Sequence, residues 1–179
     1  FTQRTDLTIE AWIYTIGGLG TIIDRGDYDM FFGINGSSLS FTNHGGNSGG
    51  VNANNVLPNN QWVHVALTWG VSDKTVRIYV NGEVKSETPN YEMRFKGGEL
   101  NIGRQSPFSC SCNTMRGKMD EVRLWSVQRT TAQILANYKK TIDATGATPT
   151  LIPAPKTAPT ITSFAPLTGN VGTTVTITG

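Results

Sequence analysis

The sequence predicts an all-β fold, either a sandwich or a barrel. Apolar and polar residues alternate in four runs, which is the period expected of strands with one buried face. Clusters of turn-forming residues separate the runs, such as NGSS at 35–38 and NHGGNSGG at 43–50. Only TAQILANYK, residues 131–139, has helical spacing, and it is long enough for one or two turns. Several short strands with almost no helix indicate an all-β architecture.

Each of the four runs predicts one strand. The runs share aliphatic residues on one face and polar or aromatic residues on the other, and they are LTIEAWIY (7–14), WVHVALTW (62–69), VRIYV (76–80) and KMDEVRLW (118–125). Asn81-Gly82 follows the third run, and an Asn-Gly pair after alternating apolar residues is a strong hairpin signal. We therefore expect residues 76–80 to turn directly into another strand.

Three aromatic residues, Trp12, Tyr79 and Trp125, lie opposite the aliphatic faces of these strands. Flat rings offer a sugar an apolar stacking surface, so these three are the candidate ligand-binding residues. The alternative is that they fill space inside the fold, which is the commoner fate of aromatic residues in a sandwich.

The composition favours an extracellular β protein. Ser, Thr, Asn and Gly make up 69 of the 179 residues, whereas charged residues are only 16%, against about 25% in an average domain. The net charge of +2 without a basic run argues against nucleic-acid binding. No apolar stretch is long enough to span a membrane. We expect a secreted or cell-surface protein.

The composition changes after Lys140, which divides the chain into three parts. Residues 1–140 form the predicted β domain, residues 141–159 read as an extended Thr/Pro-rich linker, and residues 160–179 carry a further strand pattern. Val171, Val175 and Ile177 share one face of that last pattern. So short a segment cannot form a core by itself.

Cys110 and Cys112 are separated by one residue. A disulfide at this spacing closes a small ring, which oxidising compartments permit. Free thiols and a metal site are the alternatives, and the nearest histidine, His64, is far away in sequence for a zinc site.

The order of five motifs resembles that of a known family. DLTIEAWIY (6–14), QWVHVALTW (61–69), VRIYVNGE (76–83), LNIGRQ (100–105) and GKMDEVRLWSVQRT (117–130) together resemble the laminin G-like, concanavalin A-like domains of bacterial surface proteins. The resemblance implies an antiparallel jelly-roll β-sandwich with an extended C-terminal tail. That tail, residues 158–179, looks like the start of an immunoglobulin-like IPT/TIG domain.

The family pattern begins with one more strand, which is absent here and which lies beside the last strand of the sandwich. The resemblance therefore implies an open edge at residues 118–125. A strand from the tail can fill such an edge, with Val171, Val175 and Ile177 entering the slot. The alternative is that the tail begins an ordinary neighbouring domain.

The resemblance also bears on calcium and catalysis. It implies one Ca²⁺ near the sandwich rim, with Asp120 at the matching position. Asp24, Asp27 and Asp29 are another possible oxygen cluster, or else a turn that bonds its own backbone. The paired carboxylates of the sugar-cleaving relatives are missing from the strands, so we expect no enzyme activity.

Taken together, the sequence predicts a non-catalytic extracellular recognition or adhesion module whose partner is a glycan or a surface protein. The alternative is a structural subunit of a filament or surface layer, in which copies of the chain join through the C-terminal strand.

Overall fold

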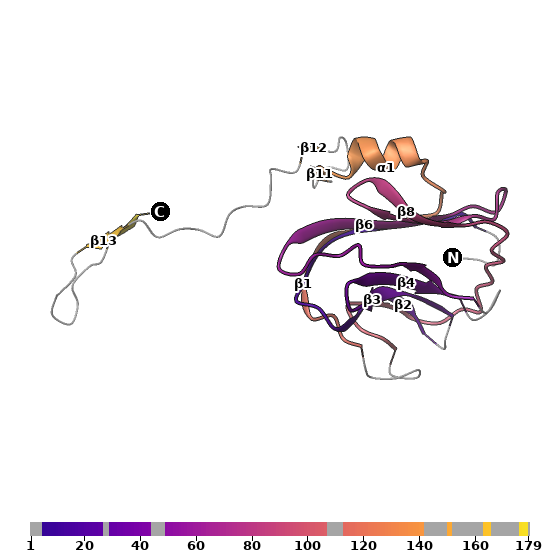
Figure 1. Cartoon of the computed structure of the whole chain (residues 1–179), viewed down its shortest axis with the longest axis horizontal. Helices are drawn as coiled ribbons and strands as arrows, with labels where there is room; N and C mark the ends of the chain where they lie inside the picture. The colour runs from indigo at the N-terminus through magenta and orange to yellow at the C-terminus, as the bar shows by residue number, and fades with distance from the viewer. Residues whose placement is uncertain are drawn as a thin grey trace.

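The computed structural model describes residues 5–26, 29–43, 49–106 and 113–141, together with 150–151, 163–165 and 176–178. In this part of the chain, two five-stranded antiparallel sheets pack face to face as a β-sandwich (Figure 1). Sheet A has the order β10 (Gly117–Trp125), β1 (Leu7–Thr15), β6 (Trp62–Trp69), β7 (Val76–Val80) and β8 (Glu83–Thr88). Sheet B has the order β5 (Val51–Ala53), β4 (Ser38–Thr42), β3 (Met30–Asn35), β2 (Leu19–Arg25) and β9 (Leu100–Ile102). The predicted all-β sandwich is confirmed.

The aliphatic faces of the strands form the core between the sheets. Leu7, Ile9 and Ile13 of β1 are each 0% exposed, as their alternation predicts. Trp69 ends the corresponding row of β6 and is buried, and its indole nitrogen donates to Tyr91 O at 2.9 Å. A buried indole needs such a partner for its N–H.

The β7–β8 hairpin turns at Asn81 and Gly82, as the sequence predicts. Their φ angles are 50° and 83°, so both lie in the left-handed region that a tight hairpin turn requires. A Cβ on Gly82 would also lie within 3.1 Å of Leu135 and Tyr138, which pack over the turn. Glycine is therefore required here by both backbone and space.

A β-bulge interrupts β10. Glu10 pairs with Arg123, but Trp12 pairs with Asp120, so one extra residue is accommodated on β10. Glu121 lies in this interval with φ 50°, and its backbone N–H donates to Asp120 Oδ1 at 2.8 Å. The bulge leaves Asp120, Arg123 and Trp125 on the outer face of sheet A.

The predicted helix is α1 (Thr131–Asn137), and it lies over the outer face of sheet A (Figure 1). Thr130 caps it: Thr130 Oγ1 accepts from Gln133 N, and the Gln133 side chain accepts from Thr130 N. This capping box satisfies two helix-end donors. Ile134 is the buried residue of the helix and packs against Ala66 and Tyr79.

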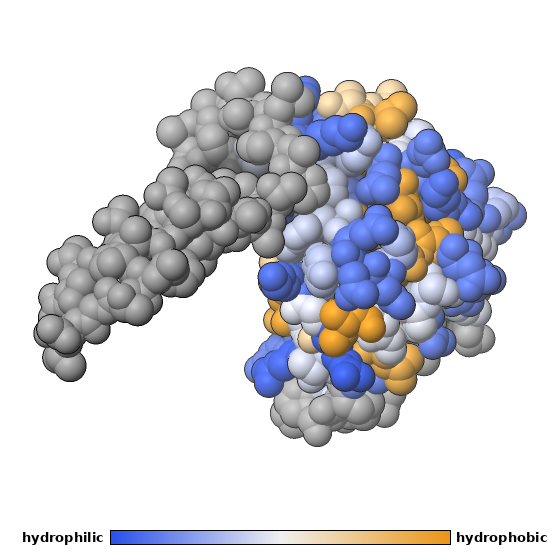
Figure 2. Space-filling model, turned by 60° about the vertical axis from the view of Figure 1, so that its left-hand side comes forward, coloured by the Kyte–Doolittle hydropathy of each residue, from blue (hydrophilic) through white to orange (hydrophobic). Residues whose placement is uncertain are grey.

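The outward side of α1 carries apolar groups, visible at the top of the molecule in Figure 2. Leu135 of this helix is 54% exposed. Elsewhere on the face drawn in Figure 2, apolar groups are small and separated by hydrophilic ones. No helix in the described part of the chain has the length and apolar character that crossing a bilayer requires.

The described residues that follow α1 form two short antiparallel pairs. β11 (Lys140–Thr141) pairs with β12 (Thr150–Leu151), and β13 (Ser163–Ala165) pairs with β14 (Thr176–Thr178). Ile177 lies opposite Phe164 in the second pair. Val171 and Val175 lie outside the described residues, so the IPT/TIG assignment and strand donation stay predictions.

Candidate functional site

The three predicted ligand-binding aromatics lie on one surface, the outer face of sheet A. Trp12 belongs to β1, Tyr79 to β7 and Trp125 to β10. Residues 127–141, called the covering segment below, cross this face and cover much of it. Thr8 Oγ1 donates to Val127 O at 2.7 Å, and Arg129 N donates back to Thr8 Oγ1 at 2.9 Å.

Tyr79 does not present its ring to solvent, contrary to its assignment as a ligand platform. It is 0% exposed beneath α1, against Ile134 and Ala66. Its hydroxyl lies 3.2 Å from Thr68 Oγ1 and 3.3 Å from Thr131 Oγ1. Tyr79 thus packs between α1 and sheet A and holds the helix to the sheet.

Trp12 is half-buried and contacts the end of the covering segment. Its indole nitrogen donates to Tyr138 O at 3.1 Å, and its ring stacks on the Tyr138 ring with centroids 6.4 Å apart. His64 packs edge-on against the same indole, with centroids 5.8 Å apart. One face of Trp12 is thus committed to Tyr138.

Trp125 is also half-buried. The Arg129 guanidinium lies 4.9 Å from its ring centroid, in a cation–π contact. Its indole nitrogen is buried and has no hydrogen-bond partner among the described residues. Trp125 therefore also packs against the covering segment.

A buried charge cluster lies beneath that segment. Glu10 is 0% exposed, Arg129 Nη1 donates to Glu10 Oε1, and Glu10 Oε2 lies 3.3 Å from His64 Nε2. Burial alone raises the pKa of Glu10, but the hydrogen bonds and charges of His64 and Arg129 bring that pKa below its ordinary value. Burial lowers the pKa of His64, against the opposing effect of Glu10. The arrangement favours an anionic Glu10 beside a neutral His64.

Two further contacts fix the ends of the covering segment. Arg123 donates to Lys140 O, and its Nη2 also donates to Glu121 Oε2 at 2.7 Å.

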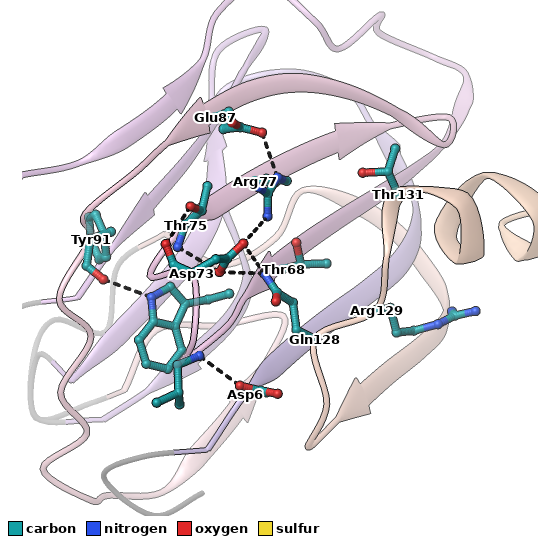
Figure 3. A network of polar contacts seen from close by, with 12 residues as sticks. Asp6, Thr68, Asp73, Thr75, Arg77, Glu87, Tyr91, Gln128, Arg129 and Thr131 are labelled. Carbon is teal, nitrogen blue, oxygen red and sulfur yellow. Dashed lines mark hydrogen bonds and ion pairs between the residues drawn. The ribbon is translucent and has the colours of Figure 1, made fainter.

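At the other end of the covering segment, Asp73 accepts from Gln128 Nε2 at 3.1 Å and from Arg77 Nη1 at 2.8 Å (Figure 3). Burial raises the pKa of Asp73, but hydrogen bonds from Arg77, Thr75 N and Gln128 lower it by more. The outer face of sheet A is therefore built to hold residues 127–141.

The described carboxylates of the two predicted metal sites each accept a backbone hydrogen bond. Asp120 is exposed, and its Oδ1 accepts from the next backbone N–H. Asp24 is 2% exposed on β2, where Asp24 Oδ2 accepts from Ser106 N at 2.9 Å, and burial raises its pKa. Asp29 Oδ1 accepts from Lys96 N at 2.8 Å. Both buried carboxylates therefore accept hydrogen bonds from the backbone of distant segments.

Asp27, Cys110 and Cys112 lie outside the described residues, so their roles stay predictions. Within the described residues, no three or more His, Cys, Asp and Glu side chains form a group suited to a metal ion.

The outer face of sheet B is a second surface, which the sequence reasoning did not select. Phe31 of β3 is half-buried on this face, whereas the adjacent Phe32 is 0% exposed in the core. A Cβ placed on Gly33 would lie only 2.4 Å from Phe31 Cζ, so the ring leans along the strand over that glycine. The sequence signal for this ring is Phe-Phe-Gly in an alternating strand, because one of two adjacent Phe side chains must point away from the core.

Uncharged polar groups flank Phe31 on the β4 side, and the buried Asp24 is its cross-strand neighbour on β2. Thr42 is its cross-strand neighbour on β4, and Ser40 is that of Gly33. Ser40 Oγ lies 2.7 Å from Oδ1 of Asn52, an exposed residue of β5. None of the residues of β3, β4 and β5 is charged.

The backbone around residues 106 and 113 closes this face on the β2 side. Asn113 O accepts from Thr21 N at 2.8 Å and from Thr21 Oγ1 at 2.7 Å, and Thr21 is 0% exposed. Over β3, β4 and β5, Asn52 is exposed, whereas Phe31, Ser40 and Thr42 are half-buried.

The lateral edge formed by β9 and β10 is a third surface. β5 packs near β8 at one side of the sandwich, which leaves β9 and β10 as the outer strands at the other side. Leu100 and Ile102 of β9 are 45% and 50% exposed. Val122 and Leu124 of β10 are only partly buried against the core. In the described part of the chain, neither strand has a second partner in its sheet.

Three solved structures share this fold. A "putative carbohydrate binding protein" from Bacteroides ovatus is 24% identical, with a TM-score of 0.65 over 85% of this chain, which spans 57% of that protein's length. The CBM40 module of the Ruminococcus gnavus IT-sialidase, bound to α2,3-sialyllactose, is 12% identical, with a TM-score of 0.63 over 75% of this chain and 83% of the module. Domain 4 of an extracellular arabinanase from Geobacillus stearothermophilus, in complex with arabinotriose, is 17% identical, with a TM-score of 0.56 over 76% of this chain and 67% of that domain.

No curated protein sequence matches the chain. The laminin G family model described as "Concanavalin A-like lectin/glucanases superfamily" matches residues 1–135. This range contains both sheets and most of α1. The chain therefore belongs to the concanavalin A-like lectin/glucanases superfamily.

Proposed function

We propose that the chain is a non-catalytic carbohydrate-recognition module that acts outside the cell, secreted or at the cell surface. Its superfamily and two fold neighbours described with bound sugars support this role. The surface composition, rich in hydroxyl and amide groups and poor in charge, suits an extracellular protein that recognises uncharged polar ligands.

The observation that carries the proposal is the contrast between the two outer faces. Residues 127–141 cover much of the outer face of sheet A and engage Glu10, Trp12 and Trp125 there. The face over β3, β4 and β5 presents a half-buried aromatic ring beside hydroxyl and amide groups. Such a combination of a few placed polar groups and an apolar surface is typical of ligand sites.

The chemistry of the carboxylates favours binding over hydrolysis. A retaining glycosidase needs two carboxyl groups about 5 Å apart on either side of the sugar bond. Glu10 lies instead under the covering segment, between His64 and Arg129, and Asp24 is buried against Ser106. These carboxylates stabilise loops rather than line an accessible surface.

A glycan array tests the proposal directly. We expect the purified chain to bind a subset of printed glycans and to leave them intact, as judged by the absence of released reducing sugar. Release of sugar would contradict the non-catalytic role, and the absence of binding to any printed glycan would contradict the recognition role.

The lateral edge favours a second candidate, a structural subunit joined by strand exchange. Unpaired strand edges accept strands from other chains, and the exposed Leu100 and Ile102 offer apolar contacts to such a strand. In this alternative the C-terminal strand of one copy, with Val171, Val175 and Ile177, occupies the edge of the next copy.

A further inference from the structure

We infer that Phe31, lying over Gly33 on the outer face of sheet B, is the stacking platform for a neutral sugar ring. This inference rests on the proposed carbohydrate-recognition function and adds to it a location and a ligand class. The site consists of Phe31, Ser40, Thr42 and Asn52, from three adjacent strands.

The orientation of the ring is the first step. The close approach of Phe31 Cζ to the Cβ position of Gly33 means that the ring extends along the strand, where any larger residue would collide with it. Gly20 O lies 2.5 Å from that same position, so Gly33 is enclosed from a second direction. The ring therefore lies over the backbone at Gly33, and Phe31 as a whole is half-buried. A flat, rigid ring of this kind suits the C–H face of a pyranose or furanose.

The polar neighbours are the second step. The carbonyl oxygen of Asn52 lies within hydrogen-bond distance of Ser40 Oγ, which orients the amide. The Asn52 amide nitrogen has no hydrogen bond to any described residue and can donate to a sugar hydroxyl. Thr42 adds a half-buried hydroxyl beside Phe31. Hydroxyl and amide groups on the β4–β5 side of an aromatic ring match the alternating polar and apolar surface of a sugar.

The absence of charge on β3, β4 and β5 is the third step, and it selects the ligand class. A carboxylate on a sialylated or uronic sugar needs a cation or a cluster of N–H donors to replace its hydration. These three strands carry no Lys, Arg or His. Asp24, the carboxylate of the neighbouring strand, is engaged by Ser106 N. We therefore expect neutral sugars to bind in preference to anionic ones.

The experiment compares variants on a glycan array that prints neutral oligosaccharides, including arabinotriose, beside matched lactose and α2,3-sialyllactose. The highest-affinity glycan is then titrated by calorimetry. We expect Phe31→Ala to weaken its affinity about tenfold or more, the loss expected for one stacking contact. Phe31→Leu, which keeps apolar bulk without a flat ring, is expected to weaken it similarly, and Asn52→Ala to a smaller extent.

Tyr14→Leu is the matched control, because Tyr14 is a half-buried aromatic on the outer face of sheet A. It should bind like the unmodified chain, and thermal unfolding of every variant shows whether it is folded. Glycan binding that survives in folded Phe31→Leu and Asn52→Ala would overturn the site while leaving the recognition function intact. Tighter binding of sialyllactose than of lactose would overturn the neutral ligand class. No glycan binding by the unmodified chain would instead overturn the recognition function itself.

Discussion

Glu10 of β1 and His64 of β6 meet beneath the covering segment, with Glu10 Oε2 3.3 Å from His64 Nε2. Arg129 donates to the other oxygen of the same carboxylate. Three segments far apart in the sequence thus contribute to one buried cluster. A buried carboxylate is costly without partners, and here a cation and an imidazole offset that cost. The cluster ties the C-terminal part of the domain to the sheet.

Replacing Glu10 should destabilise the fold strongly. Glu10→Gln removes the anion and leaves the Arg129 guanidinium, whose side chain is 11% exposed, without its charge partner. Loss of one member of a buried pair costs about 3–5 kcal/mol of unfolding free energy. Chemical denaturation measures this loss directly.

Glu83→Gln is the matched control, since Glu83 is 69% exposed and pairs with Lys85 on the surface. The control should leave the free energy of unfolding nearly unchanged. Equal stability of Glu10→Gln and the unmodified chain would show that the cluster contributes nothing to the fold.

The same cluster predicts a loss of stability in acid. The pKa of His64 is lowered from its ordinary 6.5, and that of Glu10 from its ordinary 4.5. Each group therefore binds its proton more readily in the unfolded chain, so the free energy of unfolding falls as the pH drops below about 6.5 and again below about 4.5. The raised pKa of Asp24 acts in the opposite direction near its ordinary 3.8.

His64→Gln isolates the upper part of this profile. Without the imidazole, the decline between about pH 6.5 and 5 should flatten, by at most 1.36 kcal/mol per pH unit for one proton. Denaturation curves at a series of pH values give both slopes. Identical slopes for the variant and the unmodified chain would contradict the lowered pKa of His64.

Trp125→Ala separates packing from ligand binding on the outer face of sheet A. Because the ring supports the Arg129 guanidinium and is half-buried, we expect a loss of about 2 kcal/mol in unfolding free energy. Glycan binding should persist, since the site we infer lies on the opposite sheet. Loss of glycan binding at unchanged stability would instead place the sugar on Trp125, as the sequence pattern suggests.

The sequence predicts the sheets well because alternation is a local property. Residues 7–14 and 62–69 each have one aliphatic face, and both faces are in the core. The Asn81-Gly82 turn is equally local, since its φ angles depend on two residues.

The candidate site was harder to predict. Alternation indicates which side chains point to the outer face of a sheet, but it does not indicate which segments cover that face. Tyr79 points away from the core as expected, but α1 buries it through Ile134. Glu10 and His64 occupy ordinary polar positions of two alternating strands. Only the tertiary fold brings them next to Arg129. Phe31 is outward by the same rule and is half-buried, and no helix of the described residues crosses sheet B.

Calcium removal tests the site expected at Asp120. A bound ion stabilises the folded state by about 2.7 kcal/mol at one hundred times its dissociation constant, so a chelator should lower the Tm. Asp120→Ala should have the same Tm with and without calcium. An unmodified chain whose Tm is indifferent to the chelator would remove the calcium prediction.

Deletion of residues 160–179 decides between the recognition module and the strand-donating subunit. In the structure, Ile177 on β14 pairs with Phe164 on β13, within the tail itself, and no described strand of the tail joins sheet A or sheet B. We therefore expect the truncated chain to keep the Tm, solution mass and glycan affinity of the unmodified chain. Light scattering after size-exclusion chromatography measures the mass over a range of concentrations.

Strand donation predicts that the deletion changes these properties, because a donated strand satisfies the backbone of β10 or β9 and covers Leu100 and Ile102. Its removal would dissolve any assembly, or expose the edge and lower the solubility and Tm of the domain.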